Sequence, residues 1–570
     1  MPYEVRDSRR LTGPSLWLDA PGAVLDVAVP AEEAGRAAVS WERHLRALLD
    51  ELGLETTQIG ARHYAGGLLL AFAAPVDVLY AATEINEAAW AAVAAERAGN
   101  TAPDRQEDVE RLCRVLEEER DPAFAALYAA ASERGLSCLW DGEAVSVGTG
   151  AGSCVWPKDA LPSPAEVDWG ELHDIPLALV TGTNGKSTTV RLLAAILRAA
   201  GRVAGMTTTD HVAIGDEVLD EGDYSGPSGA RLALRDPRVD AAVLEIARGG
   251  LLRRGLSVPH ATVAAVTNVA TDHLGEYGVE TVEDLAEAKF TVSKALGPGG
   301  TLVAAADDPA SRVEALRRAP ALAPRGVRLA WTALEPEVAR SHVERTSGQA
   351  WAVVDGALTL WEEGRWVPVV PVADVPSTFG GAARHNVRNA LTAAASAYAL
   401  GVSHEAIADG LRRFRSDVAD NPGRGNLLTY RGARLLIDYA HNAAGLAALL
   451  DTLEALPAER RLVLLGHAGD RSDEQIGELA RVAATLRADR YLAADLPDYL
   501  RGRAPGEVPA LLRRVLIDEG IREDAVDMFS GPPEAVRAAL DWAQPGDLLL
   551  LLVLTQRAEV MDVLREAAVI

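Results

Sequence analysis

Cysteine is scarce in this sequence, and long apolar runs are missing. Cys113, Cys138 and Cys154 stand far apart and form no CxxC pair. This spacing excludes a disulfide framework and a cysteine–histidine zinc site, and it predicts buried, reduced thiols in a cytoplasmic protein. The apolar run of residues 548–554 is too short to span a bilayer and predicts a buried strand. The first residues have mixed charge and no apolar segment, so we expect no signal peptide.

Lysine is almost as scarce, and acidic residues dominate the charge. The 570 residues include 56 basic and 82 acidic side chains, which gives a formal net charge of −26. A surface of this sign repels nucleic acid and anionic lipid, so we expect neither as a partner. The only lysines are Lys158, Lys186, Lys289 and Lys294. In a chain so rich in arginine, each of them is a candidate for chemistry that arginine cannot perform.

Residues 180–189, with the sequence VTGTNGKSTT, predict a phosphate-binding loop. An apolar run typical of a buried parallel strand, residues 175–180, precedes the loop, and residues 187–200 have helical periodicity. A strand, a turn with glycines and a helix start together gather backbone N–H groups around an anion. Lys186 would reach the terminal phosphates of a nucleotide and Ser187 would ligate Mg²⁺. The alternative is an ordinary strand-to-helix turn of an α/β domain.

The length and the pattern of apolar residues predict three domains. Residues 1–165 form an α+β domain with expected strands at 16–18, 23–29 and 67–72 and helices at 41–52, 84–98 and 107–134. Residues 170–418 alternate strands and helices as a doubly wound sheet does, and residues 419–570 have an alternating pattern of their own. We find no catalytic constellation in the first domain.

Polar residues follow several predicted strands of the central domain. Glu245 ends the strand at 241–245, Asn268 ends the next one, and His273 follows shortly after. Ligands of parallel sheets sit at the carboxyl ends of strands, so these residues and Lys186 should converge on one crevice. Ser187, Glu245 and His273 suit a magnesium site, although histidine is an unusual ligand for a cation that prefers oxygen.

The sequence from Gly182 to Thr188, GTNGKST, is typical of the Mur ligase superfamily, which joins a carboxylate to an amine through an acyl phosphate made from ATP. Lys289 lies on a predicted helix where this family places a lysine, commonly carbamylated so that it ligates magnesium; read alone, it would be a surface residue. The resemblance thus implies catalytic roles for Lys186, Glu245, His273 and Lys289. The implied metal ligands are Ser187, Glu245, His273 and Lys289.

Several further segments are most similar to the Mur-like half of cyanophycin synthetases, among them residues 207–210, 244–253, 267–275 and 498–507. The resemblance implies that Asn386 contacts adenine, Arg424 phosphate and Asp438 ribose. It also implies a fold in which a central P-loop ATP-binding domain precedes a C-terminal Rossmann-like α/β domain. The full set of residues implied to bind ATP is Gly182, Thr183, Asn184, Gly185, Lys186, Ser187, Thr188, Asn268, Asn386, Arg424 and Asp438.

These observations predict an ATP- and Mg²⁺-dependent, ADP-forming ligase of a carboxylate and an amine. The amine would be an amino acid or another small amine, and the carboxylate would belong to a peptide-like or small-molecule acceptor. Cyanophycin synthetases carry an ATP-grasp module before the Mur-like half, and this sequence has no room for one, so we expect one kind of addition. Two alternatives stay open: a ligase that makes one small amide, and a non-catalytic ATP-binding partner or regulator of another synthetase. A homo-oligomer is compatible with the sequence.

Overall fold

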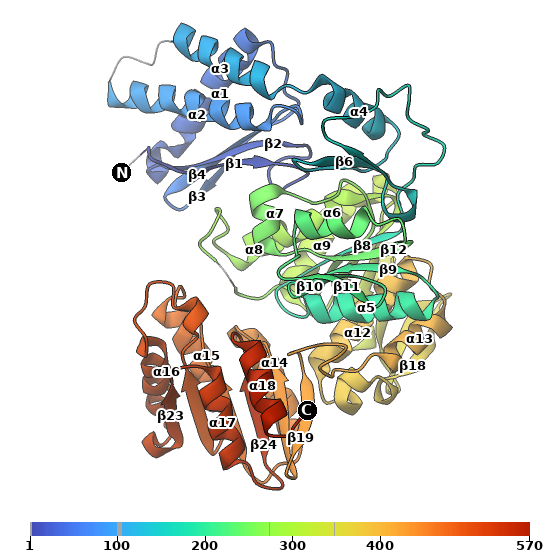
Figure 1. Ribbon diagram of the computed structural model, residues 1–570, viewed down its shortest axis with the longest axis vertical. Coiled ribbons are helices and arrows are strands. Elements are labelled where there is room, and N and C mark those ends of the chain that lie inside the picture. Colours follow the sequence, from blue (N-terminus) through green and yellow to red (C-terminus); the bar gives the residue numbers. More distant parts are fainter. Residues whose placement is uncertain (1–2, 100–104, 273, 347) are drawn as a thin grey trace. The chain divides into compact units, whose positions relative to one another are not determined.

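The computed structural model describes residues 3–99, 105–272, 274–346 and 348–570. The chain forms two compact units, which are described separately (Figure 1). The first comprises Met1–Ala352, Leu360–Val367 and Leu391–Gly410, and the second Val353–Thr359, Pro368–Ala390 and Leu411–Ile570. The three expected domains, 1–165, 170–418 and 419–570, stay a prediction.

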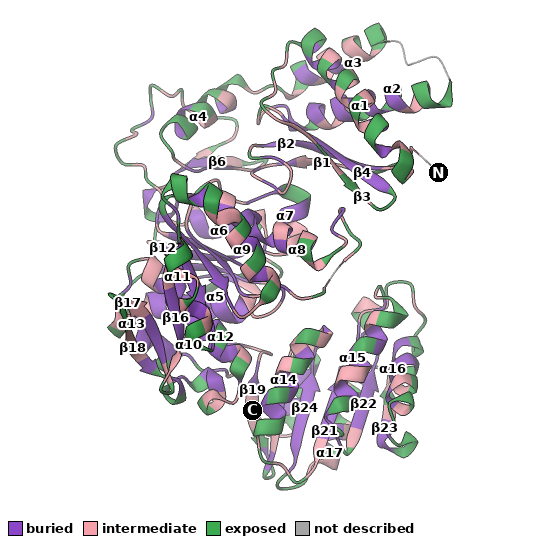
Figure 2. Cartoon of the chain, turned by 180° about the vertical axis from the view of Figure 1, so that it is seen from behind, coloured by how far each residue is buried: buried purple, intermediate pink, exposed green. Residues whose placement is uncertain are grey.

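The first unit begins with an antiparallel sheet of strand order β1-β2-β4-β3, whose apolar core includes Trp41 and Trp90. β4 is buried along its whole length, as its unbroken apolar sequence predicts (Figure 2). A separate small sheet, β5-β6-β7, follows. The elements are β1 Val5–Leu11, β2 Gly22–Ala28, α1 Ala31–Leu52, β3 Ile59–Tyr64, β4 Gly67–Ala73, α2 Leu79–Ala98, α3 Arg105–Glu119, α4 Pro122–Glu133, β5 Cys138–Trp140, β6 Ala144–Val147 and β7 Cys154–Pro157.

Two expectations for this region are wrong. Residues 16–18 are not a strand, because the Ser15 hydroxyl accepts hydrogen bonds from the N–H groups of Trp17 and Leu18 and folds the segment into a turn. The expected helix at 107–134 is two helices, α3 and α4. Pro122 cannot donate a backbone hydrogen bond, and Asp121 caps the second helix by accepting from Phe124 N at 2.9 Å.

The central sheet has the strand order β11-β10-β9-β12-β8-β13-β14-β15-β16-β17-β18. β8 lies between β12 and β13 and is parallel to both, so the carboxyl ends of all three strands meet at one edge. The elements are β8 Leu177–Thr181, α5 Lys186–Ala199, β9 Ala204–Thr207, β10 His211–Ile214, β11 Glu217–Glu221, α6 Pro227–Leu234, β12 Ala241–Glu245, α7 Arg248–Arg254, β13 Ala261–Val266, α8 Val282–Lys289, β14 Leu296–Ala305, α9 Pro309–Leu322, β15 Arg328–Thr332, α10 Pro336–Arg340, α11 Val343–Thr346, β16 Gln349–Val354, β17 Ala357–Glu362, β18 Arg365–Pro371, α12 Arg384–Ala399 and α13 His404–Arg413.

The C-terminal sheet has the order β19-β20-β24-β21-β22-β23 and is parallel except for β19. β24 consists of five buried leucines, as the apolar run at 548–554 predicts for a central strand. The elements are β19 Asn426–Tyr430, β20 Ala433–Asp438, α14 Ala443–Ala455, β21 Arg461–Leu465, α15 Asp473–Thr485, β22 Arg490–Ala494, α16 Glu507–Asp518, β23 Val526–Phe529, α17 Pro532–Trp542, β24 Leu548–Leu552 and α18 Arg557–Glu566.

The three thiols are free, but only Cys138 is buried; Cys113 and Cys154 are half-buried, which corrects the expectation for these two. Cys113 lies on α3, where only Leu112 and Leu116 are fully buried. Within the described part of the chain, no helix combines the length and the hydropathy that a membrane crossing requires.

Candidate nucleotide site

The phosphate-binding loop joins β8 to α5, as the sequence predicts. Gly185 caps α5 with φ +81°, and no side chain occupies the cap. The first N–H groups of the helix are therefore open to an anion, and the positive end of the helix dipole favours negative charge there. Thr189 N donates to Gly185 O at 2.9 Å and closes the first helical turn. This arrangement fits a phosphate group.

Asn268, at the end of β13, holds the loop from the side. Thr183 N donates to Asn268 O at 3.0 Å, and Asn184 N donates to Asn268 Oδ1 at 2.9 Å. The Asn268 amide returns a hydrogen bond to Asn184 O at 2.9 Å. Thr183 Oγ1 also accepts from Ala270 N at 3.0 Å. The sequence predicts that Asn268 binds the nucleotide; in the structure, both polar atoms of its side chain form hydrogen bonds with the loop.

Gly182 allows two backbones to approach each other closely. Its φ is +148°, and a Cβ atom there would lie 1.9 Å from Thr267 Oγ1. That hydroxyl donates to Asn184 O at 2.7 Å and so belongs to the same clamp. Only glycine fits this position. The sequence contains Thr267, but nothing in it indicates this role.

The side chains of Lys186, Ser187 and Thr188 start α5. Lys186 Nζ curls back and donates to Thr183 O at 3.1 Å, which places the ammonium beside the loop. Ser187 Oγ lies 3.3 Å from Thr209 Oγ1, and Thr188 is buried. A cation and a hydroxyl thus flank the helix start, where the phosphate-binding role requires them.

Glu245, at the end of β12, is paired in register with Val180 of β8. Its side chain is 1% exposed, and Oε2 accepts from Thr209 N at 3.3 Å. Oε1 is buried and has no hydrogen-bond partner among the residues that the structure describes. A buried carboxylate oxygen without a partner is costly, and a cation would satisfy it.

Lys289, the last residue of α8, reaches the same loop from 107 positions away in the sequence. It is 4% exposed, and its Nζ donates to Gly182 O at 2.8 Å. Burial lowers the pKa of Lys289 well below the ordinary value, and the charge of Lys186 lowers it further. The structure therefore excludes the surface position that Lys289 would occupy if it were an ordinary lysine. His273 lies outside the described residues.

Asn386, Arg424 and Asp438 belong to the second unit. Asn386 is buried; its Nδ2 donates to Ser377 O at 2.9 Å. Asp438 ends β20 and accepts from Ala440 N at 2.8 Å. Burial raises the pKa of Asp438 to about 6, against the opposing effects of the Arg424 charge and of backbone hydrogen bonds.

Tyr439 belongs to the same unit, and no sequence motif indicates a role for it. The guanidinium carbon of Arg424 lies 5.2 Å from the centre of its ring, and that of Arg557 lies 4.4 Å from it. Cations over an aromatic face are attracted by its quadrupole. Arg557 begins α18, more than a hundred residues from Tyr439, and sequence spacing could not associate the two.

Comparisons with known proteins identify the family. Residues 180–397 match the Mur ligase middle domain, and residues 423–552 match the Mur ligase glutamate ligase domain. The chain is 37% identical to a cyanophycin synthetase of Trichormus variabilis over 66% of its length, and it spans only 41% of that relative. It is 30% identical to a UDP-N-acetylmuramoyl-L-alanyl-D-glutamate–2,6-diaminopimelate ligase of Corynebacterium efficiens, over 66% of this chain and 68% of that one.

Among solved structures, Escherichia coli FolC in complex with DHPP and ADP matches 69% of this chain and 89% of its own, with 22% identity and a TM-score of 0.48. The two domain matches follow each other along the chain; the first includes the phosphate-binding loop, and the second includes most of the C-terminal sheet. Members of the family use ATP and a divalent metal. The chain therefore belongs to the Mur ligase family, whose members are ATP-dependent, ADP-forming ligases of an acid and an amino acid.

Proposed function

We propose that this chain activates a carboxylate with ATP and transfers the acyl group to an amine, most simply an amino acid. The observation that carries the proposal is the arrangement around the loop: Lys186 and buried Lys289 donate to its carbonyl groups, and Glu245, with one unpaired oxygen, ends the strand next to β8. A protein that only binds ATP needs the loop, but it does not need a buried carboxylate and a buried amine beside it. These groups suit phosphoryl transfer.

The reaction has two steps. An oxygen of the acceptor carboxylate attacks the γ-phosphorus of ATP, and the bond to ADP breaks. The amine nitrogen then attacks the carbonyl carbon of the acyl phosphate, phosphate leaves, and the nitrogen loses a proton. The Lys186 ammonium stabilises the charge that develops on the transferred phosphoryl group, and the loop clamped by Asn268 orients it.

A Mg²⁺ ion fits the residues present. Mg²⁺ prefers oxygen ligands and usually keeps waters and substrate phosphates in its shell. Ser187 Oγ and Glu245 Oε1 supply oxygens, and the latter lacks a partner among the described residues. No group of three or more histidine, cysteine, aspartate or glutamate side chains gathers as a metal cage in the described part of the chain. The ion would neutralise phosphate charge when bound.

Lys289 has the properties that carbamylation needs. Its low pKa favours the neutral amine, which can bond to CO₂, and the product would be an anionic oxygen ligand next to the loop. Protein incubated with ¹³C-bicarbonate should therefore give a carbamate signal in ¹³C NMR that the Lys289→Arg variant lacks. A spectrum without that signal in the wild type would contradict this assignment.

The proposed function is tested by the release of ADP and phosphate from ATP and Mg²⁺ in the presence of amino acid pools and short acidic acceptors. Product masses identify the pair that was joined. Turnover that requires both a carboxylate and an amine, with a mass gain of one condensation, is the expected result. ATP binding without turnover in every pool would overturn the proposal in favour of a non-catalytic partner of another synthetase.

A further inference from the structure

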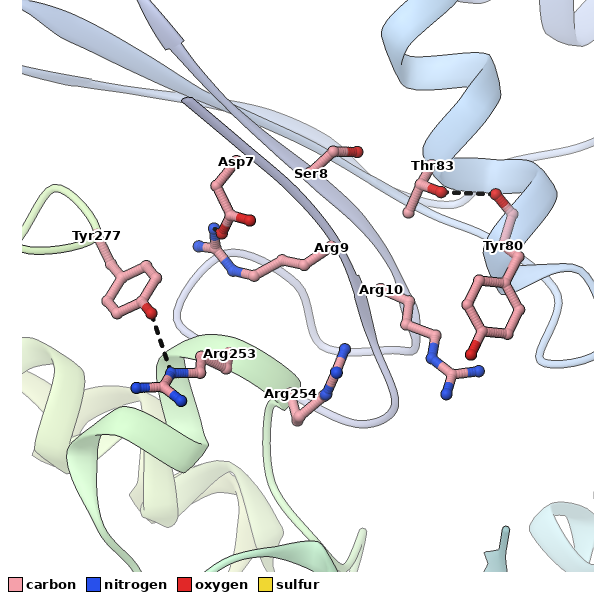
Figure 3. Close-up of a pocket in the computed structure, with 9 residues that line it drawn as sticks. All are labelled: Asp7, Ser8, Arg9, Arg10, Tyr80, Thr83, Arg253, Arg254 and Tyr277. Atoms are coloured by element: carbon pink, nitrogen blue, oxygen red, sulfur yellow. Dashed lines mark hydrogen bonds and ion pairs between the residues drawn. The ribbon is translucent and has the colours of Figure 1, made fainter. Parts of the chain in front are cut away.

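A second feature of the first unit is a pocket of about 400 Å³ between the N-terminal sheet and the central domain (Figure 3). Strand β1, the start of α2, the end of α7 and a loop residue, Tyr277, form its walls. Among the described residues, neither the phosphate-binding loop nor Ser187, Glu245 and Lys289 contribute to its lining. Its lining consists of Asp7, Ser8, Arg9, Arg10, Tyr80, Thr83, Arg253, Arg254 and Tyr277.

The charge of this pocket is opposite to that of the chain. Four arginines face one carboxylate, Asp7, whereas the whole chain has a formal net charge of −26. Guanidinium groups stay charged at every physiological pH, so their mutual repulsion cannot be relieved by losing a proton. An anion in the pocket would relieve it, and a positive cleft in a negative surface concentrates anions.

The four arginines differ in how many hydrogen bonds their guanidinium groups form with the protein. Arg9 is 6% exposed; it donates to Leu252 O at 3.1 Å and to Asp7 at 2.5 Å, while its second terminal nitrogen is buried without a partner among the described residues. Arg253 Nε donates to Tyr277 Oη at 3.0 Å. A buried guanidinium nitrogen that the protein leaves unpaired is a donor for a ligand oxygen.

The guanidinium groups of Arg10 and Arg254 have the most N–H donors available for a ligand. The Arg10 guanidinium lies 3.9 Å from the centre of the Tyr80 ring, which orients it without using its N–H groups. In the described part of the chain, neither Arg10 nor Arg254 forms a side-chain hydrogen bond or ion pair. Both present planar donors suited to carboxylate or phosphate oxygens.

The walls of the pocket are firmly joined. Thr12 N donates to Arg254 O at 2.8 Å, and Leu256 N donates to Pro14 O at 2.7 Å. At Gly13 the backbones pack so tightly that a Cβ atom would lie 2.3 Å from Leu256 O. The free-energy cost of ordering the site on ligand binding is therefore small, because these backbone contacts already hold its walls in place.

Helix α7 connects this pocket to the nucleotide site. It begins three residues after Glu245 and ends at Arg254, so its seven residues span roughly 10 Å. An extended peptide covers about 3.3 Å per residue, and three or four residues would bridge that distance. One extended molecule can thus have one end at the phosphate-binding loop and the other among the arginines.

We propose that the arginine pocket binds the distal anionic part of the carboxylate acceptor, a group with two or more carboxylate or phosphate oxygens. This inference rests on the proposed function for the identity of the ligand as acceptor. A second pocket of about 580 Å³ shares Arg10, Tyr80 and Arg254 with the first, so the groove continues past the arginines.

The direct test measures binding by calorimetry without ATP. The probes are tetra-aspartate, tricarballylate and pyrophosphate, which separate a peptide, a small polycarboxylate and a phosphate source. The Arg10→Gln/Arg254→Gln variant should bind the preferred probe about 100-fold more weakly, since a hydrogen bond to a charged group contributes roughly tenfold or more. Neither side chain forms a hydrogen bond or an ion pair in the described part of the chain, and the ring on which Arg10 stacks, Tyr80, is exposed, so the variant should fold.

A matched control separates the effect of losing the pocket arginines from the effect of changing the net charge. Arg202→Gln removes one positive charge from an exposed position away from the pocket, and it should change affinity less than twofold. Wild-type protein that binds none of the probes, or a double variant that binds as tightly as the wild type, would overturn the inference.

Turnover distinguishes this inference from the proposed function. In the double variant the KM for the acceptor should rise at least tenfold, while the KM for ATP and the kcat at saturating acceptor stay within twofold of the wild type. Probe binding that depends on Arg10 and Arg254 in a protein without ligase activity would refute the proposed function and leave an anion site. Ligase activity with an unchanged acceptor KM in the double variant would refute the arginine pocket alone.

Discussion

Replacing Gly182 with alanine should remove most of the nucleotide affinity and leave the fold intact. Alanine at φ +148° adopts a backbone conformation that costs about 1–3 kcal/mol. Its Cβ would lie 1.9 Å from Thr267 Oγ1, so Thr267 must turn away and give up its hydrogen bond to Asn184 O, which costs about 1 kcal/mol more. The sum of about 2–4 kcal/mol corresponds to roughly 30- to 700-fold in affinity if the loop must be restored before ATP can bind.

The assay is a titration with a fluorescent ATP analogue, together with thermal unfolding. Gly201→Ala is the matched control, because Gly201 also has a positive φ, +76°, but no atom lies within 4 Å of its hypothetical Cβ. The control should lose about 1 kcal/mol of stability and keep its ATP affinity within twofold. Equal ATP affinity in the wild type and the Gly182 variant would refute the reasoning that this loop must keep its observed shape to hold phosphate.

Three further predictions follow from the site. Lys186→Ala should lower ATP turnover at least 100-fold and leave the melting temperature unchanged, since the amine makes one hydrogen bond to the described residues, to Thr183 O; full phosphate release would refute its role. Lys289→Arg, which cannot be carbamylated, should reduce turnover strongly, and a wild-type rate would exclude a catalytic Lys289. Because burial raises the pKa of Asp438 from 3.8 to about 6, its ionisation costs the folded protein up to about 3 kcal/mol as the pH rises through 4 to 6. Asp438→Asn should therefore gain melting temperature relative to wild type between pH 5 and 7.5, and a difference independent of pH would contradict the assignment.

Local sequence was sufficient to predict the loop and its flanking elements. The apolar run before Gly182 and the helical periodicity after Gly185 predict β8 and α5 to within two residues. β12 and β24 agree as closely, because a buried parallel strand is an unbroken apolar run of fixed length. The turns were predicted less well. The turn at Ser15 and the helix break at Pro122 depend on single hydrogen bonds and caps, which a hydropathy pattern does not indicate.

Tertiary structure alone decided which distant residues share a site. The sequence by itself determined the family, the P-loop and the candidates Lys186, Glu245, Asn268 and Lys289. Lys186 belongs to the loop motif, Glu245 and Asn268 end predicted strands, and Lys289 occupies the position at which the family resemblance places a lysine. That Lys289 is buried against Gly182, and that Asn268 shapes the loop, follows from strand order and helix packing. The arginine pocket combines residues more than 240 positions apart, and only the docking of the N-terminal sheet brings them together. Long-range packing sets the burial and the local charge that turn a motif into a site, and no local pattern in a sequence contains that information.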